Sequence, residues 1–280
     1  MKAAIIANIE GVKRIEEFCR QLKSIDIMPV FCENHIPKDC ENEKSEAFES
    51  LISSCDIVIA LGGDGTLIHA AKQAALKNKR VLGINFGRLG YNTGLEINEL
   101  HLLKALKDYY LYHTESRMML EVSVEGKTYY CLNDAVISRG TLSRIIDISV
   151  KFDGESEINC YSDGVIIATP TGSTAYSMSA GGPVVDPSID GILVTPICDH
   201  SLFSRPIFLN AKTVLTVSAN CKKNSEVYLT IDGQTGIKLS DDSVVTIKKS
   251  KFSAQLIKIK NDSFIHIVNE KLIKKRGDVV

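Results

Sequence analysis

The sequence has no excess of charge of either sign, because 33 lysines and arginines face 34 aspartates and glutamates and leave a formal net charge of −1. Proteins that bind nucleic acid or acidic membranes through their charge carry a clear basic excess, so we expect neither partner. Short basic clusters occur at 248–251 and 274–276. We interpret them as solvated edges rather than binding patches.

Long apolar runs and paired cysteines are also missing. No apolar run reaches the length of about 20 residues that spans a bilayer, and the opening residues are too few for a signal peptide and predict a first strand. The eight cysteines form no C-x-x-C pair, and several lie in apolar stretches. This favours buried free thiols in a reducing cytoplasm over disulfides or a zinc site.

A phosphate-binding lysine is missing from the first glycine turn, Gly62-Gly-Asp-Gly-Thr66, so the turn is not a Walker loop. The apolar run Ile57–Leu61 precedes it and predicts a buried strand, and residues 67–76 have helical spacing. Strand, glycine turn and helix let backbone N–H groups face a phosphate, here from Gly62, Gly63, Gly65 and Thr66. The alternative is a tight turn whose glycines supply only positive φ and whose aspartate caps the helix.

The ionisable group in this turn is Asp64. A carboxylate beside bound polyphosphate is repelled unless it holds a cation or accepts a proton, which favours phosphoryl transfer over simple binding. The turn resembles the loop shared by phosphofructokinases, diacylglycerol and sphingosine kinases, and NAD kinases, and it does not choose among them.

The hydrophobic pattern divides the chain into two domains. Strands and helices alternate up to about residue 115, which predicts a Rossmann-like parallel sheet with its ligand at the carboxyl ends of the strands. The second glycine-rich turn, 86–94, is expected at the same edge, and Asn98 is expected to cap a helix after it. From 116 to 261 apolar residues alternate, as in an antiparallel, β-sandwich-like domain. Residues 262–280 return to helical spacing and are assigned to the first domain.

One stretch of the second domain breaks this alternation. After the buried run Val165–Ala168 come Pro170 and then mostly small or hydroxylated residues around Tyr176. Such residues let a ligand approach the backbone and offer neutral hydrogen-bonding groups, and the tyrosine offers a flat face to a base or sugar. Asp163, just before the strand, can accept hydrogen bonds from a ribose or amide. The alternative is a turn rich in serine and threonine.

Residues 169–183, Thr-Pro-Thr-Gly-Ser-Thr-Ala-Tyr-Ser-Met-Ser-Ala-Gly-Gly-Pro, resemble the signature of NAD kinases. Three further segments resemble that family in the family's order: Leu132-Asn-Asp134, the segment 195–206, and Asp232-Gly-Gln234. The resemblance implies transfer of the γ-phosphoryl of ATP to the 2′-hydroxyl of the adenosine ribose of NAD, which makes NADP. A lipid kinase of the diacylglycerol or sphingosine type and a catalytically silent NADP(H)-binding sensor remain alternatives.

The resemblance also implies residue roles. Asp64 would be the general base, and an NAD-binding set would comprise Asp64, Gly65, Asn133, Asp134, Arg144, Asp163, Thr174, Ala175, Tyr176, Ser177, Met178, Ser179 and Gln234. Many members have glutamate at the position of Asp134, and some have arginine at the position of Tyr161. The chain shows no dedicated carboxylate cluster for a metal, so we expect Mg²⁺ to arrive on the phosphates of ATP. Polyphosphate as donor and NADH as acceptor stay open, and exposed sheet edges predict a homodimer or homotetramer.

Overall fold

The computed structural model describes residues 1–8, 12–32, 45–46, 48–87, 90–140, 145–200, 205–220 and 226–274 of the chain. The chain divides into two compact units, of which unit 1 comprises residues 1–116 and 254–280 and unit 2 comprises residues 117–253. Two long strands, β7 (His113–Val124) and β18 (Val244–Lys258), carry the chain across the two boundaries. The return to unit 1 therefore takes place inside a strand.

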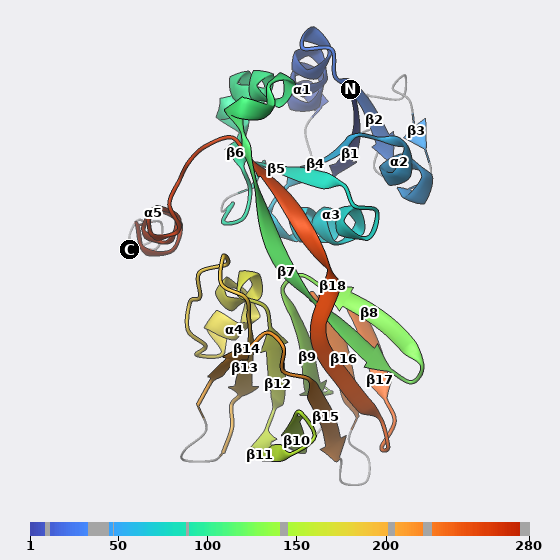
Figure 1. Ribbon diagram of the computed structural model, residues 1–280, viewed down its shortest axis with the longest axis vertical. Coiled ribbons are helices and arrows are strands. Elements are labelled where there is room, and N and C mark those ends of the chain that lie inside the picture. The colour runs from blue at the N-terminus through green and yellow to red at the C-terminus, as the bar shows by residue number, and fades with distance from the viewer. Residues whose placement is uncertain are drawn as a thin grey trace. The chain divides into compact units, whose positions relative to one another are not determined.

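Unit 1 is built on a parallel sheet whose central strands lie in the order β2–β1–β4–β5 (Figure 1). These strands are β1 (Lys2–Ala7), β2 (Met28–Cys32), β4 (Ile57–Gly62) and β5 (Arg80–Asn85), and the short strands β3 (Ser45–Glu46) and β6 (Leu95–Glu96) pair with β2 and β5. The helices are α1 (Val12–Ser24), α2 (Phe48–Ser54) and α3 (Asp64–Leu76). All six residues of β4 are buried, as a strand covered on both faces requires. The predicted Rossmann-like alternation is confirmed.

The segment after β6 is a 3₁₀-helix, η2 (Ile97–Lys107), followed by a single 3₁₀ turn, η3 (Tyr109–Leu111). Its buried leucines, Leu100, Leu103 and Leu106, recur every three residues, which is the period of a 3₁₀-helix and not of an α-helix. The prediction that Asn98 caps this helix is wrong. The helix begins at Ile97, and the Glu99 side chain accepts from the backbone N–H of Glu96 at 2.8 Å.

The end of the chain returns to unit 1 as predicted. Helix α5 (Phe264–Val268) leads into a π-helical turn, η5 (Asn269–Lys274). Lys271 on this turn pairs with Glu96 at 3.0 Å. Among the described helices, none combines the length and apolar character that a bilayer crossing requires.

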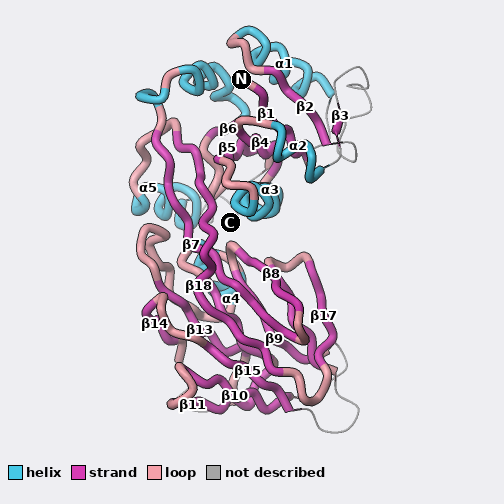
Figure 2. The backbone as a smooth tube through the Cα atoms, turned by 45° about the vertical axis from the view of Figure 1, so that its right-hand side comes forward, coloured by secondary structure: helices cyan, strands magenta, loops and turns pink. Residues whose placement is uncertain are grey.

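Unit 2 is built of antiparallel strands (Figure 2), and its largest buried cluster draws residues from most of them. One six-stranded sheet runs in the order β14–β13–β12–β9–β16–β17. Its strands are β9 (Asp134–Arg139), β12 (Gly164–Ala168), β13 (Gly191–Ile197), β14 (Ile207–Asn210), β16 (Val227–Ile231) and β17 (Thr235–Leu239). The remaining strands are β7 with β8 (Lys127–Cys131), and β10 (Ile146–Phe152), β11 (Ser156–Ser162), β15 (Leu215–Asn220) and β18.

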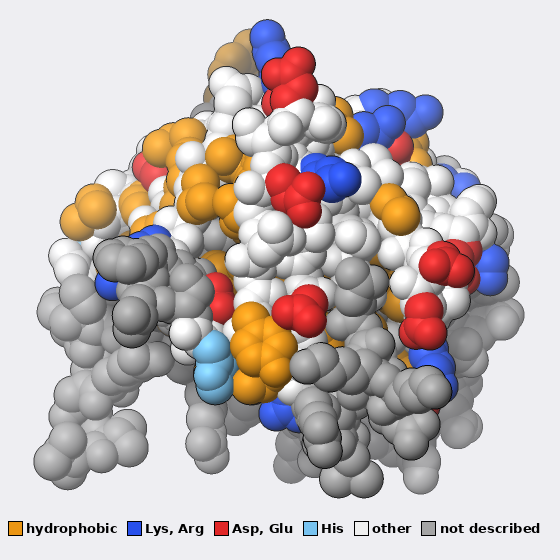
Figure 3. Space-filling view, turned by 90° about the horizontal axis from the view of Figure 1, so that it is seen from below, with side chains coloured by type: hydrophobic (Ala, Val, Ile, Leu, Met, Phe, Trp, Pro, Cys, Tyr) orange, Lys and Arg blue, Asp and Glu red, His pale blue; other side chains and the backbone are white. Residues whose placement is uncertain are grey.

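Alternate residues of the two sets of strands meet in the interior of unit 2. Ile148 and Val150 of β10 join Ile137 of β9 and Ile167 of β12 in one buried cluster. This is the packing of a β-sandwich, so the predicted fold class is confirmed. On the surface seen from below Figure 1, acidic and basic side chains are interspersed among the described residues (Figure 3), in keeping with the balanced composition.

Candidate active site

The first glycine turn joins β4 to α3, and its glycines differ in their surroundings. A Cβ added at Gly62 would lie 2.4 Å from Thr66 Oγ1, so the fold itself requires glycine there. A Cβ at Gly63 or Gly65 would meet no atom of the described residues within 4 Å. The backbone at these two positions is therefore open to a ligand at the N-terminus of a helix, where N–H groups and the helix dipole favour an anion.

Asp64 is the first residue of α3, and both of its carboxylate oxygens are held by the second glycine-rich turn. Oδ2 accepts from the backbone N–H of Tyr91 at 2.9 Å, and Oδ1 accepts from that of Asn92 at 2.8 Å. Burial raises the pKa of the Asp64 carboxyl, and the two backbone hydrogen bonds and the charges of Lys271 and Lys258 oppose this rise. The result is an oriented carboxylate whose oxygens keep further lone pairs for a substrate hydroxyl.

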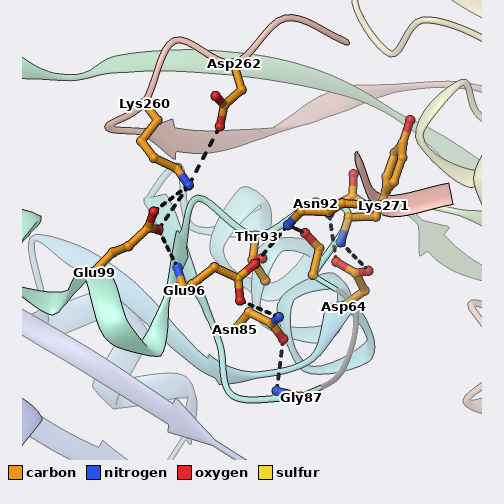
Figure 4. Close-up of polar contacts among 12 residues, drawn as sticks. Asp64, Asn85, Gly87, Asn92, Thr93, Glu96, Glu99, Lys260, Asp262 and Lys271 are labelled. Atoms are coloured by element: carbon orange, nitrogen blue, oxygen red, sulfur yellow. Dashed lines mark hydrogen bonds and ion pairs between the residues drawn. The ribbon is translucent and has the colours of Figure 1, made fainter. Parts of the chain in front are cut away.

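Two lysines, Lys258 and Lys271, hold the same turn through its carbonyl groups, and Figure 4 labels Lys271. Lys258 Nζ donates to the carbonyl oxygens of Asn92 at 3.0 Å and Thr93 at 3.5 Å, and Lys271 Nζ donates to that of Gly90. Lys258 is 6% exposed. The turn is thus fixed on one side to Asp64 and on the other to two ammonium groups that come from the end of the chain.

The two lysines also line a cleft within unit 1, together with Glu96, Lys260 and Asp262. Glu96 accepts from Asn85 Nδ2 at 2.7 Å and pairs with Lys271, and Lys260 pairs with Glu99 at 2.9 Å. Figure 4 shows these contacts near Asp64, whose own hydrogen bonds go to the turn. Asp64 is therefore held by a turn whose other contacts come from residues far away in the sequence, which local sequence patterns do not reveal.

In unit 2, the segment Leu132–Asp134 is held by Asp232, which lies in the turn between β16 and β17. Asp232 Oδ1 accepts from the backbone N–H groups of Leu132 at 3.1 Å, Asn133 at 2.8 Å and Asp134 at 3.3 Å. Thr169 binds the other side, since its hydroxyl donates to the carbonyl oxygen of Leu132 at 2.5 Å. Residues of two separate segments therefore fix one short stretch of backbone.

The side chains of Asn133 and Asp134 in this stretch can hydrogen-bond to a ligand. Asn133 Oδ1 is buried and has no hydrogen-bond partner among the described residues, and buried amide oxygens rarely stay unpaired. Asp134 is 5% exposed. Burial, with a smaller contribution from the charge of Asp232, raises the pKa of the Asp134 carboxyl to about 7. Near neutral pH this group can therefore donate as well as accept a hydrogen bond.

The hydroxyl-rich stretch forms two short helical turns, η4 (Thr171–Thr174) and α4 (Tyr176–Ser179). Tyr176 is 47% exposed, so its ring is available to a ligand. Ser177 is buried, and its hydroxyl bonds to that of Thr195 at 2.8 Å. Ser179 is exposed, and Thr174, Ala175 and Met178 are half-buried. The side chain of Ser177 thus serves the packing of this turn, while Tyr176 and Ser179 are exposed.

Asp163 forms an ion pair with Arg139 at the end of β9. Arg139 Nε donates to Asp163 Oδ1 at 2.6 Å, and Nη2 donates to Oδ2 at 3.4 Å. The carboxylate raises the pKa of the Arg139 guanidinium through this bond. Sequence reasoning missed Arg139, because no local pattern marks a single arginine at a strand end.

The structure adds no support for the role of two predicted site residues, Gln234 and Arg144. Gln234 is exposed in the turn that Asp232 begins, and Arg144 lies outside the described residues. Among the described residues, no group of three or more histidines, cysteines, aspartates or glutamates is placed to hold a metal ion.

Comparison with known proteins assigns both halves of the chain to one family. The family model for the ATP-NAD kinase N-terminal domain matches residues 11–110, and that for the ATP-NAD kinase C-terminal domain matches residues 132–259. The chain belongs to the ATP-NAD kinase family. An NAD kinase of Thermoanaerobacter pseudethanolicus is 37% identical over 98% of this chain and 99% of its own length. An NAD kinase of Geobacter sulfurreducens is 36% identical over 97% and 98%.

Solved structures agree with this membership. The crystal structure of an NAD kinase from Archaeoglobus fulgidus in complex with ATP superposes with a TM-score of 0.75 at 26% identity, covering 97% of this chain and 98% of that chain. Yeast NADH kinase complexed with NADH shares the fold, with a TM-score of 0.83 at 23% identity over 96% and 86% of the two chains. The predicted family is confirmed.

Proposed function

We propose that this ATP-NAD kinase family member transfers the γ-phosphoryl of ATP to the 2′-hydroxyl of the adenosine ribose of NAD, with Asp64 as general base. NAD kinase activity follows from the family membership of both halves and from relatives of nearly the same length. The observation that carries the role of Asp64 is its geometry. Two backbone amides orient its carboxylate beside a glycine turn whose backbone is open at Gly63 and Gly65.

In this proposal, the hydroxyl proton passes to Asp64 as the bond from the ribose oxygen to phosphorus forms and the bond from phosphorus to the bridging oxygen of ADP breaks. An alcohol is a poor nucleophile near pH 7, and a positioned base contributes about 10²–10⁴-fold. Burial raises the pKa of Asp64, which makes its carboxylate a better proton acceptor than an exposed aspartate.

The open backbone of the first glycine turn fits the phosphates of the donor. Mg²⁺ bound to ATP would neutralise charge on the transferred group. We assign it to the phosphates, because Mg²⁺ keeps several waters and needs few protein ligands. Gly62 and Thr66 shape the turn, and the backbone N–H groups of Gly63 and Gly65 are assigned to the donor.

Unit 2 supplies the NAD-binding residues of this proposal. Asn133, whose buried amide oxygen has no partner in the described part of the chain, and Asp134 would hydrogen-bond the ribose and adenine region. Tyr176 would stack on a ring, and Asp163 would contact the nicotinamide end while paired with Arg139. Thr174, Ala175, Met178 and Ser179 would line the pocket, with Ser177 setting the turn. Gln234 and Arg144 are proposed as outer contacts.

The test is a coupled assay for NADP formed from NAD, ATP and Mg²⁺. We expect turnover on NAD and none on extracted lipids.

Asp64→Asn should keep NAD binding within a few-fold and lower kcat by at least about 10²-fold. Near-normal turnover of Asp64→Asn would remove this residue from the role of base, and NADP(H) binding without any turnover in the parent chain would point to the sensor alternative. Replacing ATP with polyphosphate, and NAD with NADH, in the same assay settles the donor and acceptor ranges.

We further propose a cytoplasmic homo-oligomer, either a dimer or a tetramer. Four of the described cysteines, Cys19, Cys55, Cys131 and Cys160, are buried and form no disulfide, which suits a reducing compartment. The edge strand β14 exposes Ile207 and Phe208, and an apolar edge needs cover. Light scattering coupled to gel filtration measures the assembly, and a monomer at micromolar concentration would contradict it.

A further inference from the structure

The turn Gly90–Thr93 connects Asp64 to two lysines within unit 1. Its amides at Tyr91 and Asn92 donate to the Asp64 carboxylate. Its carbonyl groups at Gly90, Asn92 and Thr93 accept from lysine ammonium groups. Any movement of this turn moves the two donors that orient Asp64, so whatever fixes the turn also fixes the carboxylate.

Lys258 is the more deeply buried of these lysines. It ends β18, is 6% exposed, and reaches the carbonyl oxygens of Asn92 and Thr93 at 3.0 and 3.5 Å. Burial of an ammonium group is costly, and an apolar side chain of similar length would pack at this position without that cost. An apolar side chain could not make the hydrogen bonds to the turn that the lysine makes.

We propose that Lys258 is a positioning residue for phosphoryl transfer, which fixes the turn Gly90–Thr93 and thereby orients the Asp64 carboxylate, with Lys271 bracing the turn at Gly90. The inference rests on the proposed role of Asp64 as base. Lys258 acts through the backbone and touches neither substrate in this account.

The charges around the turn come from several elements. Lys258 lies on β18 and Lys271 on η5, and both favour the ionised form of Asp64. Glu96 of β6 pairs with Lys271. Farther out, Lys260 pairs with Glu99 at 2.9 Å and approaches Asp262 at 3.7 Å. Loss of Lys258 therefore removes both a hydrogen-bond anchor and a positive charge near the base.

The test compares Lys258→Met with Lys260→Met by steady-state kinetics across pH. Lys260 is two positions farther along the chain and donates to Glu99 and not to the turn, so its variant is the matched control. In Lys258→Met we expect kcat to fall about 10–100-fold with the KM for NAD within about twofold. The acidic limb of the kcat–pH profile should move to higher pH, because loss of a positive charge raises the pKa of Asp64. Lys260→Met should leave both kcat and the acidic limb of the kcat–pH profile as they are in the parent.

An unchanged kcat in Lys258→Met would overturn the inference. A kcat that falls only in proportion to the loss of folded protein, with the acidic limb of the kcat–pH profile in its parental place, would overturn it as well. If Lys258→Met does not fold by thermal melting, Lys271→Met gives the same readouts from a more exposed position, and an unmoved profile there overturns the inference. Asp64→Asn measured alongside separates the two proposals. Normal turnover of Asp64→Asn removes the base, whereas loss of turnover there with normal Lys258→Met rejects only the positioning role.

Discussion

Asp232 and Asn133 are 99 residues apart in the sequence, and the carboxylate of the first accepts the backbone N–H of the second at 2.8 Å. The same oxygen also accepts from Leu132 and Asp134. Three donors on one carboxylate oxygen fix the backbone from which Asn133 and Asp134 project. The family resemblance includes Asp232 in a motif, and the structure shows that its carboxylate holds the backbone of residues 132–134.

Asp232→Ala should weaken NAD binding and destabilise unit 2. Hydrogen bonds to a charged group contribute about 1.5–3 kcal/mol, and Asp232 adopts φ +49°, a backbone conformation that alanine tolerates less well than aspartate or asparagine. Asp232→Asn is the matched control, since it keeps the turn and an acceptor. Denaturant unfolding and calorimetric titration with NAD measure both effects. Equal stability and affinity in the alanine variant and the parent would show that the three hydrogen bonds do not matter.

Asp134 should make stability depend on pH. Its pKa is raised to about 7 in the folded chain from an unfolded value of about 3.9, so between about pH 4 and 7 the folded state binds the proton and the unfolded state does not. Stability therefore falls as pH rises through this window. A pKa shift of this size lowers the free energy of unfolding by about 4 kcal/mol once the pH has passed through the whole window.

Asp134→Asn removes the ionisation and nearly keeps the shape. We expect the free energy of unfolding of the asparagine variant, relative to the parent, to increase by up to about 4 kcal/mol from pH 4 to pH 8. Urea unfolding at each pH measures it. A difference that stays constant across this range would mean that Asp134 is ionised throughout.

The sequence predicted the local parts of this protein and missed the contacts between distant segments. The apolar run before Gly62 and the helical spacing after Thr66 were enough to place the strand, turn and helix around Asp64, because each depends on neighbours in the chain. The hydrogen bonds of Lys258 to Asn92 and of Lys271 to Gly90 join residues 166 and 181 positions apart. No periodic pattern carries such pairings, and the pairing of Arg139 with Asp163 is of the same kind.

Tyr176→Ala tests the stacking surface. Its ring is 47% exposed, so removal leaves no large cavity, and stability should change little. If the ring stacks on a base, NAD affinity should fall by about 1–3 kcal/mol, by analogy with base–aromatic stacking. Tyr176→Phe keeps the ring and should bind NAD as the parent does. Calorimetric titration of both variants measures this, and an alanine variant with parental affinity would reject stacking.

The two kinds of glycine in the first turn should respond differently to alanine. Gly62→Ala places a methyl group 2.4 Å from Thr66 Oγ1, and such overpacking costs about 1–3 kcal/mol of stability. In the part of the chain that the structure describes, the added methyl group of Gly65→Ala meets no atom within 4 Å. The change replaces a glycine in a helix, so the melting temperature should hold or rise. A methyl group there would nevertheless occupy space assigned to the donor phosphates, and we expect the KM for ATP to rise at least about tenfold, which is about 1.4 kcal/mol. Thermal melts paired with ATP kinetics separate the two effects, and a Gly65→Ala variant with a parental KM for ATP would place the phosphates elsewhere.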